Sequence, residues 1–340
     1  MAAGALQAKT AEELRIYLNP GHGSYGPNDR PMSTIGHPQT SNLGDPDTLG
    51  FYEGRGTLPR AFGIGSYLKQ VGVKPENIVY SRLANGPWPY TGSVSTYDPE
   101  ETFNRPLSEI CEEVEAGNFD MFISSHSNAA TDGTTTNYPL YLYRGQDGAG
   151  GDQVAGSRDM ANTTWPYHHM NTDLEPQTAY TNSTNIRGDW DFYGSHSVGT
   201  RSNGKQYDGY LGVLKHGTPG YLLEGYFHTY QPARHRALNF DYDRVEGIRE
   251  ARGVAAYFGL EQTGKGEIMG TVKDMHEKIS HNLFKYAPRT NDQWLPLNGA
   301  VVKLLKDGQE VASYSVDNEY NGIFVFYDLE PGEYTLEASC

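Results

Sequence analysis

Three short apolar runs of this chain end on residue types that can bind or serve a metal ion. Runs of this length and composition predict buried strands. Ligands of an open α/β sheet bind outside the carboxyl ends of its strands, so the residues after the three runs are expected to converge, although they are far apart in the sequence. The runs and their following residues are Ile16 to Leu18 before Asn19-Pro20-Gly21-His22-Gly23, Met121 to Ser125 before His126, and Tyr221 to Leu223 before Glu224.

Amphipathic helices are predicted between these strands. Apolar residues recur at helical spacing over 61–71, 106–115 and 245–258, and a further short strand is expected at 77–80. This alternation predicts an α/β fold in which helices flank a mostly parallel central sheet.

The region 130–209 interrupts this pattern. It is rich in Asn, Thr, Ser and Gly, carries scattered aromatic residues, and could contain one more strand at 138–143. The aromatic residues favour an ordered wall beside a binding groove, with a disordered loop as the alternative. Whether this insertion gates the groove is not predicted.

The composition excludes several classes of function. Asp and Glu number 42 against 27 Lys and Arg, giving a formal net charge of −15, and no basic run could neutralise a phosphate backbone. A nucleic acid is therefore not expected as a partner. No apolar stretch reaches the roughly 18 residues of a membrane-spanning segment. The 2 cysteines, Cys111 and Cys340, do not make a disulfide framework.

The C-terminal part of the chain switches to an alternation of period two, with turn dipeptides between the expected strands. This predicts a small antiparallel β-sandwich over 267–340 after a polar linker over 261–266. Its motifs are Gly270-x-Val272, Pro296-Leu297-Asn298-Gly299-Ala300-x-Val302, Asn321-Gly322-x-Phe324-x-Phe326 and Leu329-x-Pro331-Gly332-x-Tyr334. Through these motifs the segment resembles the carboxypeptidase regulatory-like (transthyretin-like) modules. The stretch 276–294 is longer than the usual hairpin, and the module could be truncated.

Metal chemistry is the first hypothesis for the residues that follow the strands. Catalytic zinc needs three protein ligands of the His or carboxylate type and one open position for water. His22 lies between two glycines, which let the backbone turn sharply and bring the imidazole into a cleft. His22 alone is weak evidence for a metal site, because the chain holds 11 histidines. A single His after a strand is more often a hydrogen-bonded core or surface residue.

The motifs around these residues occur in a specific order over about 15–260. They are Asn19-Pro20-Gly21-His22-Gly23, Glu53 ahead of a helix, Ser81-Arg82, Arg105, the block Asp120 to Ala129 around His126, Val213-Leu214-Lys215, and Pro219-Gly220-Tyr221-Leu222-Leu223-Glu224-Gly225-Tyr226-Phe227. This order resembles the N-acetylmuramoyl-L-alanine amidases of type 3, a family of zinc hydrolases.

The resemblance implies roles for four residues. His22, Glu53 and His126 would be the zinc ligands, and Glu224 would be the catalytic carboxylate. Zinc would lower the pKa of a bound water, and Glu224 would accept the water proton and return it to the leaving amine. The implied reaction is hydrolysis of the amide between N-acetylmuramic acid and L-alanine. Peptidoglycan or a muropeptide is thus the expected substrate, and cell-wall remodelling the expected role.

The spacing of the first two expected ligands departs from the family pattern. The loop 24–50 between His22 and Glu53 is an insertion, which leaves Asp45 or Asp47 as rival ligands.

Other positions also leave alternatives. Asn19 stands where the family has Asp, so a hydrogen bond from this position to a ligand imidazole would be weaker. Glu224 could be a strand-end carboxylate paired with Lys215 or Arg234. Arg82 and Arg105 could contact acidic groups of the stem peptide, but structural ion pairs are the favoured interpretation.

The predicted organisation has four parts. They are a signal-peptide remnant or disordered start over 1–12, a zinc amidase catalytic domain over 13–260, the linker over 261–266 and the β-sandwich module over 267–340. The small residues of Met1 to Ala8 resemble the tail of a signal peptide. We therefore expect export to the periplasm or cell envelope of a bacterium. The sequence does not predict an oligomeric state.

Two other functions remain open. A related zinc hydrolase could act on another amide or peptide, and a non-catalytic protein could keep the fold to bind peptidoglycan. Glu224 argues against the second, because a binding protein does not need this carboxylate.

Overall fold

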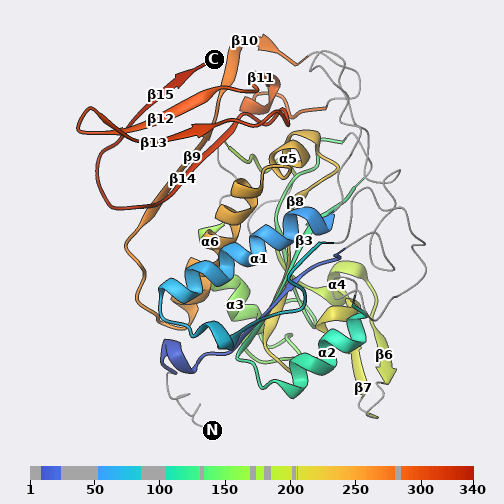
Figure 1. Cartoon of the computed structure of the whole chain (residues 1–340). Coiled ribbons are helices and arrows are strands. Elements are labelled where there is room, and N and C mark those ends of the chain that lie inside the picture. Colours follow the sequence, from blue (N-terminus) through green and yellow to red (C-terminus); the bar gives the residue numbers. More distant parts are fainter. Residues whose placement is uncertain are drawn as a thin grey trace.

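A six-stranded mixed sheet forms the centre of the fold (Figure 1). The computed structural model describes residues 9–23, 53–85, 105–130, 134–168, 174–179, 185–200, 204, 206–279 and 285–340. Met1 to Ala8, the predicted signal-peptide remnant, and the rival ligands Asp45 and Asp47 lie outside the described residues.

The strands of the central sheet lie in the order β2-β1-β3-β8-β4-β5. Neighbouring strands are parallel from β2 to β8, β4 is antiparallel to β8, and β5 is parallel to β4. The prediction of a mostly parallel sheet is confirmed, and so is a strand within 138–143. The bounds are β1 Ile16–Pro20, β2 Ile78–Tyr80, β3 Met121–Asn128, β4 Leu140–Tyr143, β5 Ile186–Gly188 and β8 Gly220–Phe227.

Helices cover both faces of this sheet because alternate strand residues are apolar on each side. Helices α1 (Glu53–Gln70), α3 (Ser157–Thr164) and α6 (Phe240–Tyr257) pack on one face, whereas α2 (Leu107–Ala116) and α5 (Gln231–Arg236) pack on the other. Within the described ranges, no helix combines the length and apolarity that crossing a membrane requires. Ile16, Leu18, Met121, Ile123, Tyr221 and Leu223 face α1 and α6, and Tyr17, Phe122, Leu140, Leu142 and Leu222 face α2.

The described parts of the 130–209 insertion are ordered. They contain α3, β5, the short helix α4 (Asp189–Tyr193) and a hairpin of β6 (Ser197–Thr200) and β7 (Gln206–Gly209). The buried carboxylate of Asp189 accepts three backbone hydrogen bonds, from Gly145, Tyr210 and Leu211, at 2.9–3.0 Å. Asp189 thereby ties the chain after β7 to the residues after β4.

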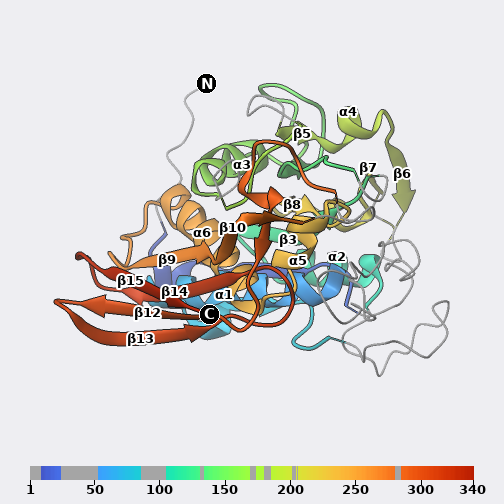
Figure 2. The same cartoon turned by 90° about the horizontal axis from the view of Figure 1, so that it is seen from above.

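The C-terminal strands form small antiparallel sheets, β13-β12-β15, β14-β9 and β10-β11. Side chains of β12 and β14 share one apolar cluster, which includes Val302, Leu304, Phe324 and Phe326. Figures 1 and 2 place these strands and the β6-β7 hairpin on opposite sides of the central sheet. The bounds are β9 Gly266–Thr271, β10 Lys273–Lys278, β11 Trp294–Pro296, β12 Val301–Lys306, β13 Gln309–Ser315, β14 Ile323–Leu329 and β15 Thr335–Ser339.

In the described part of the chain, five short 3₁₀ helices connect these elements. They are η1 Ala11–Glu13, η4 Pro75–Asn77, η5 Trp165–Tyr167, η7 Gly212–Leu214 and η8 Asn291–Gln293.

Helix α6 carries three buried carboxyl groups, those of Asp243, Glu246 and Glu250. Arg60 of α1 pairs with Glu246 and also donates a hydrogen bond to the backbone oxygen of His126, at 2.9 Å. Burial raises the pKa of Glu246 and of Glu250 to about 7. Glu250 Oε1 accepts a hydrogen bond from the Tyr221 hydroxyl at 2.9 Å, and its Oε2 has no partner among the described residues.

The raised pKa of Glu250 predicts a pH-dependent gain in stability for Glu250→Gln. The folded state retains a proton that the unfolded state releases between the ordinary carboxyl pKa and about 7, so the free energy of unfolding falls as the pH rises through this window. Glu250→Gln removes this penalty and keeps an acceptor for Tyr221. Chemical unfolding should show a gain on the order of 2 kcal/mol at pH 8 and little gain at pH 4. An equal effect at both pH values would contradict the assignment, and the exposed Glu337→Gln is the control.

Candidate functional site

His22 lies in a tight turn beyond the end of β1, directly over His126. The Gly21 amide donates a hydrogen bond to the Ser125 oxygen at 2.9 Å, and a Cβ at Gly21 would collide with the His126 ring. His22 itself has a φ of 60°, in the left-handed region that costs a residue with a side chain about 1 kcal/mol. The turn therefore requires Gly21 and holds His22 in a strained conformation, which is common at functional sites.

Glu53 is the first residue of α1, one turn earlier than the apolar pattern indicates. The buried Arg82 donates hydrogen bonds to Gly21 O at 3.1 Å and to Gly54 O at 3.0 Å, and thus joins the two chain segments that carry His22 and Glu53. Arg82 also donates to Thr57 Oγ1, at 2.9 Å. The sequence pointed to a structural Arg82 but not to this bridging role.

His126 lies near the end of β3 and has partners on both ring nitrogens. Its Nδ1 lies 2.9 Å from Glu53 Oε1, and its Nε2 lies 2.9 Å from Ser124 Oγ. Ser124 Oγ accepts a hydrogen bond from Asn19 Nδ2 at 2.8 Å, and Asn19 Oδ1 accepts one from Ser81 Oγ at 2.7 Å. Asn19 therefore supports the imidazole through Ser124.

The structure brings His22, Glu53 and His126 together. Glu53 Oε2 lies 3.0 Å from His22 Nε2, and the ligand atoms of all three residues lie within 4.8 Å of one another. The three side chains are only 10–15% exposed. Glu53 Oε1 also accepts a hydrogen bond from the Ser127 amide at 2.8 Å, a contact that the sequence did not predict.

The electrostatics of this group favour an ionised Glu53 carboxylate and a neutral His126 imidazole. Burial acts to raise the pKa of Glu53, but the charge of His22 and hydrogen bonds from both imidazoles hold this pKa well below its ordinary value. Burial lowers the pKa of His126, against the opposing effect of its hydrogen bond to Glu53. Neutral imidazole and ionised carboxylate are the forms that bind a metal.

These residues fit a zinc ion. Two imidazoles and one carboxylate are the donor set of many catalytic zinc sites. Their ligand atoms already point at one another, and Ser124 fixes the ring of His126 through its other nitrogen, as ligand imidazoles require. This is the one such group among the residues that the structure describes.

Glu224 lies beside this group on the neighbouring strand. Residue 224 of β8 is paired directly with His126 of β3, and residues paired in this way project to the same face of a sheet. Glu224, His22, Glu53 and His126 all line one pocket of about 550 Å³. The convergence of the three strand ends, expected from the sequence, is thus present.

The insertion supplies an aromatic wall to this pocket. Phe192, Tyr193 and Tyr138 of the insertion, and Tyr210 directly after it, line the pocket together with His22, Glu53 and His126. The rings of Tyr193 and Tyr210 are stacked, with centroids 3.9 Å apart and an interplanar angle of 16°. Because Asp189 fixes the backbone of Tyr210, the wall is preorganised.

A smaller pocket of about 160 Å³ adjoins the same two histidines and is lined by Arg82 and Arg105. Arg105 Nη1 lies 2.7 Å from Glu113 Oε2 and its Nε lies 3.7 Å from Glu109 Oε2. The structural ion pair expected for Arg105 is present.

Comparisons with known proteins identify similar solved structures. An N-acetylmuramoyl-L-alanine amidase (AmiC2) of Nostoc punctiforme matches 72% of this chain and 97% of its own, at 18% identity and a TM-score of 0.45. The catalytic domain of such an amidase (CwlV) from Bacillus (Paenibacillus) polymyxa var. colistinus matches 73% of this chain and 99% of its own, at 18% identity and a TM-score of 0.45.

A third amidase of the same name (Ami1), from Mycobacterium smegmatis, matches 74% of this chain and 99% of its own, at 15% identity and a TM-score of 0.47. All three carry the name of an N-acetylmuramoyl-L-alanine (N-acetylmuramyl-L-alanine) amidase. No protein-family model and no curated protein sequence matches the chain.

Proposed function

We propose that this protein is a zinc-dependent N-acetylmuramoyl-L-alanine amidase that hydrolyses peptidoglycan or muropeptides in the bacterial cell envelope. The observation that carries the proposal is the placement of Glu224 beside the group of His22, Glu53 and His126 in one pocket. Three ligands that leave a position open for water, and a separate carboxylate that can move a proton, are the groups that metal-assisted hydrolysis of an amide uses. The order of the sequence motifs supports the same proposal.

Each residue has a defined role in this proposal. His22, Glu53 and His126 would hold the zinc ion, which when bound would supply a Lewis acid for the amide oxygen and lower the pKa of a water molecule. Glu224, at the end of an apolar strand, accepts a proton from the attacking water and delivers it to the leaving amine nitrogen. Glu53 cannot take this role, because its two oxygens face the imidazoles.

The aromatic wall supports a substrate that contains a sugar. Flat aromatic faces pack against the C–H faces of pyranose rings, and polar side chains such as Asn128 and Thr136 in the same pocket can bind hydroxyl or acetamido groups. The muramic acid ring would lie on Tyr193 and Tyr210, with its lactyl amide directed to Glu224.

The wall predicts a selective effect of Tyr210→Ala. The variant should raise KM for a muropeptide about tenfold with little change in kcat, because the ring contributes binding and no chemistry. Tyr210→Phe keeps the ring and should behave like the wild type. Steady-state kinetics would exclude the role if both variants lost the same activity, or if Tyr210→Ala changed kcat alone.

Metal analysis combined with mass spectrometry of digested muropeptides tests the proposed function. The expected result is one zinc per chain and release of free peptides that begin with L-alanine. Intact muropeptides after incubation with the zinc-loaded protein would refute the amidase and favour a binding protein. Cleavage within the stem peptide, with the lactyl amide intact, would point to a different zinc hydrolase.

A further inference from the structure

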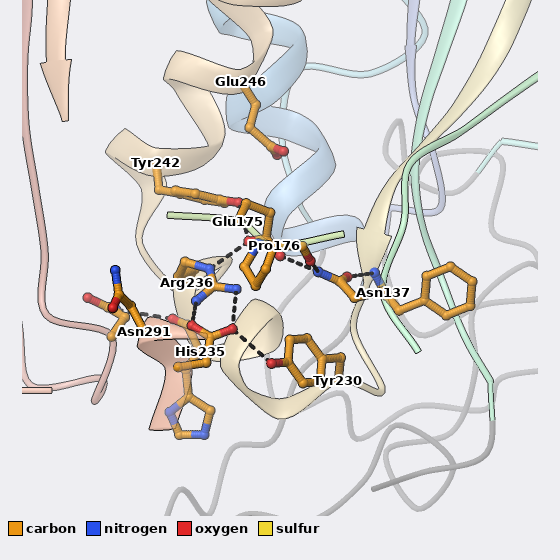
Figure 3. Close-up of polar contacts among 12 residues, drawn as sticks. Asn137, Glu175, Pro176, Tyr230, His235, Arg236, Tyr242, Glu246 and Asn291 are labelled. Atoms are coloured by element: carbon orange, nitrogen blue, oxygen red, sulfur yellow. Dashed lines mark hydrogen bonds and ion pairs between the residues drawn. The ribbon is translucent and has the colours of Figure 1, made fainter. Parts of the chain in front are cut away.

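The C-terminal strands and the central fold share a buried polar network around Arg236 of α5 (Figure 3). The side chains of Arg236, Glu175 and Asp292 are each at most 2% exposed. Arg236 Nε donates to Glu175 Oε2 at 2.6 Å, and Arg236 Nη1 donates to Asp292 Oδ1 at 2.6 Å. Arg236 and Glu175 belong to the part before the linker, whereas Asp292 lies in η8, between β10 and β11.

The network continues from Glu175 to the strand that carries Glu224. Glu175 accepts hydrogen bonds from Tyr242 OH, at 2.8 Å, and from Asn137 Nδ2. Asn137 Oδ1 in turn accepts the amide of Phe227, the last residue of β8, at 3.0 Å. Figure 3 shows Glu175 lying between Arg236 and Asn137. Polar contacts therefore connect Asp292 without a break to a position three residues beyond Glu224.

The other side of the network belongs to residues 273–292. Tyr230 OH donates to Asp292 Oδ2 at 2.8 Å and accepts the amide of Ala287 at 3.0 Å. Lys273 Nζ lies 3.5 Å from Asp292 Oδ1, and burial lowers the pKa of Lys273 to about 8. The stretch 276–294 is longer than the usual hairpin of the carboxypeptidase regulatory-like modules that this segment resembles. It contains Asp292, whose carboxylate faces Arg236.

Apolar contacts extend the same interface along α6. Tyr242 and Val245 of α6 pack with Ile323 and Val325 of β14, and all four are buried. Glu267 of β9 forms ion pairs with Arg249 and Arg252 of α6. An interface with a buried apolar cluster and desolvated charges is typical of parts that fold together, whereas mobile domains meet through more polar surfaces.

We propose that the segment 267–340 is a fixed part of the catalytic unit, in which Asp292 neutralises Arg236 and, through Glu175 and Asn137, holds the end of β8 beside Glu224. The buried cluster holds two cations, Arg236 and Lys273, and two carboxylates, Glu175 and Asp292, so loss of Asp292 leaves one positive charge uncompensated. An uncompensated buried charge costs far more than the loss of an exposed ion pair. Asp292 is a positioning residue in this scheme, and the 13–260 domain predicted from the sequence would be incomplete alone.

Cleavage of the linker in the full chain tests the association. A specific protease site placed within 261–265 lets the connection be cut after folding. The two fragments should remain a 1:1 complex in size-exclusion chromatography at micromolar concentration, and Asp292→Ala should weaken that complex at least roughly tenfold. Separation of the wild-type fragments after cleavage would overturn the proposal.

Hydrogen exchange in the uncut chain tests the link to β8. Asp292→Ala should speed exchange of the Phe227 amide at least roughly tenfold, with a much smaller change at Leu222 in the middle of β8. Lys303→Gln, which removes an ion pair with Glu310 that is 46% exposed, is the matched control and should change neither amide. Equal acceleration along all of β8, or none at Phe227, would refute the positioning role, and neither readout depends on amidase activity.

Discussion

Replacing Glu224 with Gln is expected to reduce amide hydrolysis by roughly 10³-fold while the zinc content stays at the wild-type level. Gln keeps the size of the side chain but cannot accept the proton of the attacking water. Glu224 lines the same pocket as the proposed ligands His22, Glu53 and His126, yet it is not among the three residues whose ligand atoms converge. The loss should therefore appear in kcat, with metal affinity unchanged.

This experiment distinguishes an acid/base role of Glu224 from a role as a zinc ligand. Zinc content and muropeptide turnover are measured on the same preparation, with Glu310→Gln, on an exposed strand, as the control for loss of a negative charge. Retained turnover would refute the acid/base assignment. Loss of zinc together with activity would show that Glu224 is a ligand.

Replacing Glu53 with Ala is expected to lower zinc affinity by at least roughly 100-fold and to abolish hydrolysis. Glu53 has one carboxylate oxygen within 3.0 Å of each imidazole and receives the Ser127 amide, so its loss removes a ligand and leaves His22 and His126 without their shared partner. Competition with a chromophoric chelator measures the affinity directly.

Thermal unfolding gives a second readout for Glu53. Zinc at about 100 times its dissociation constant stabilises a folded protein by about 2.7 kcal/mol, so the wild type should melt at a higher temperature when zinc is added. Glu53→Ala should lose this shift, whereas Asp45→Asn and Asp47→Asn, at the rival positions, should retain it. A variant of Asp45 or Asp47 that loses the shift would instead place the third ligand in the 24–50 loop.

The main strands and helices were predictable because their signals are local. The period of the apolar residues predicted β1, β3, β8, α2 and α6 within a few residues, and the alternation of elements gave the mostly parallel sheet. The antiparallel orientation of β4 relative to β8 was not predictable, since a short apolar run does not reveal the direction in which a strand joins a sheet.

The candidate site was likewise predictable from the sequence only in part. His22, His126 and Glu224 follow apolar strands, so the sequence alone indicated that they would meet at one edge of the sheet. For Arg82 the sequence favoured a structural ion pair over contact with the stem peptide, but it did not indicate which segments Arg82 joins. Its bridge between the His22 turn and the start of α1 depends on contacts between segments whose separation along the chain carries no periodic signal.

The sequence by itself determined which residues follow the strands and in what order, and the family resemblance carried by this order implied zinc and amide hydrolysis. Only the tertiary structure decided that Glu53 joins the two histidines across a long insertion, and that Asp292 reaches Arg236 from beyond the linker. The physical reason is that local periodicity encodes which face of an element is buried, whereas the pairing of buried charges depends on distances that only the packed chain defines.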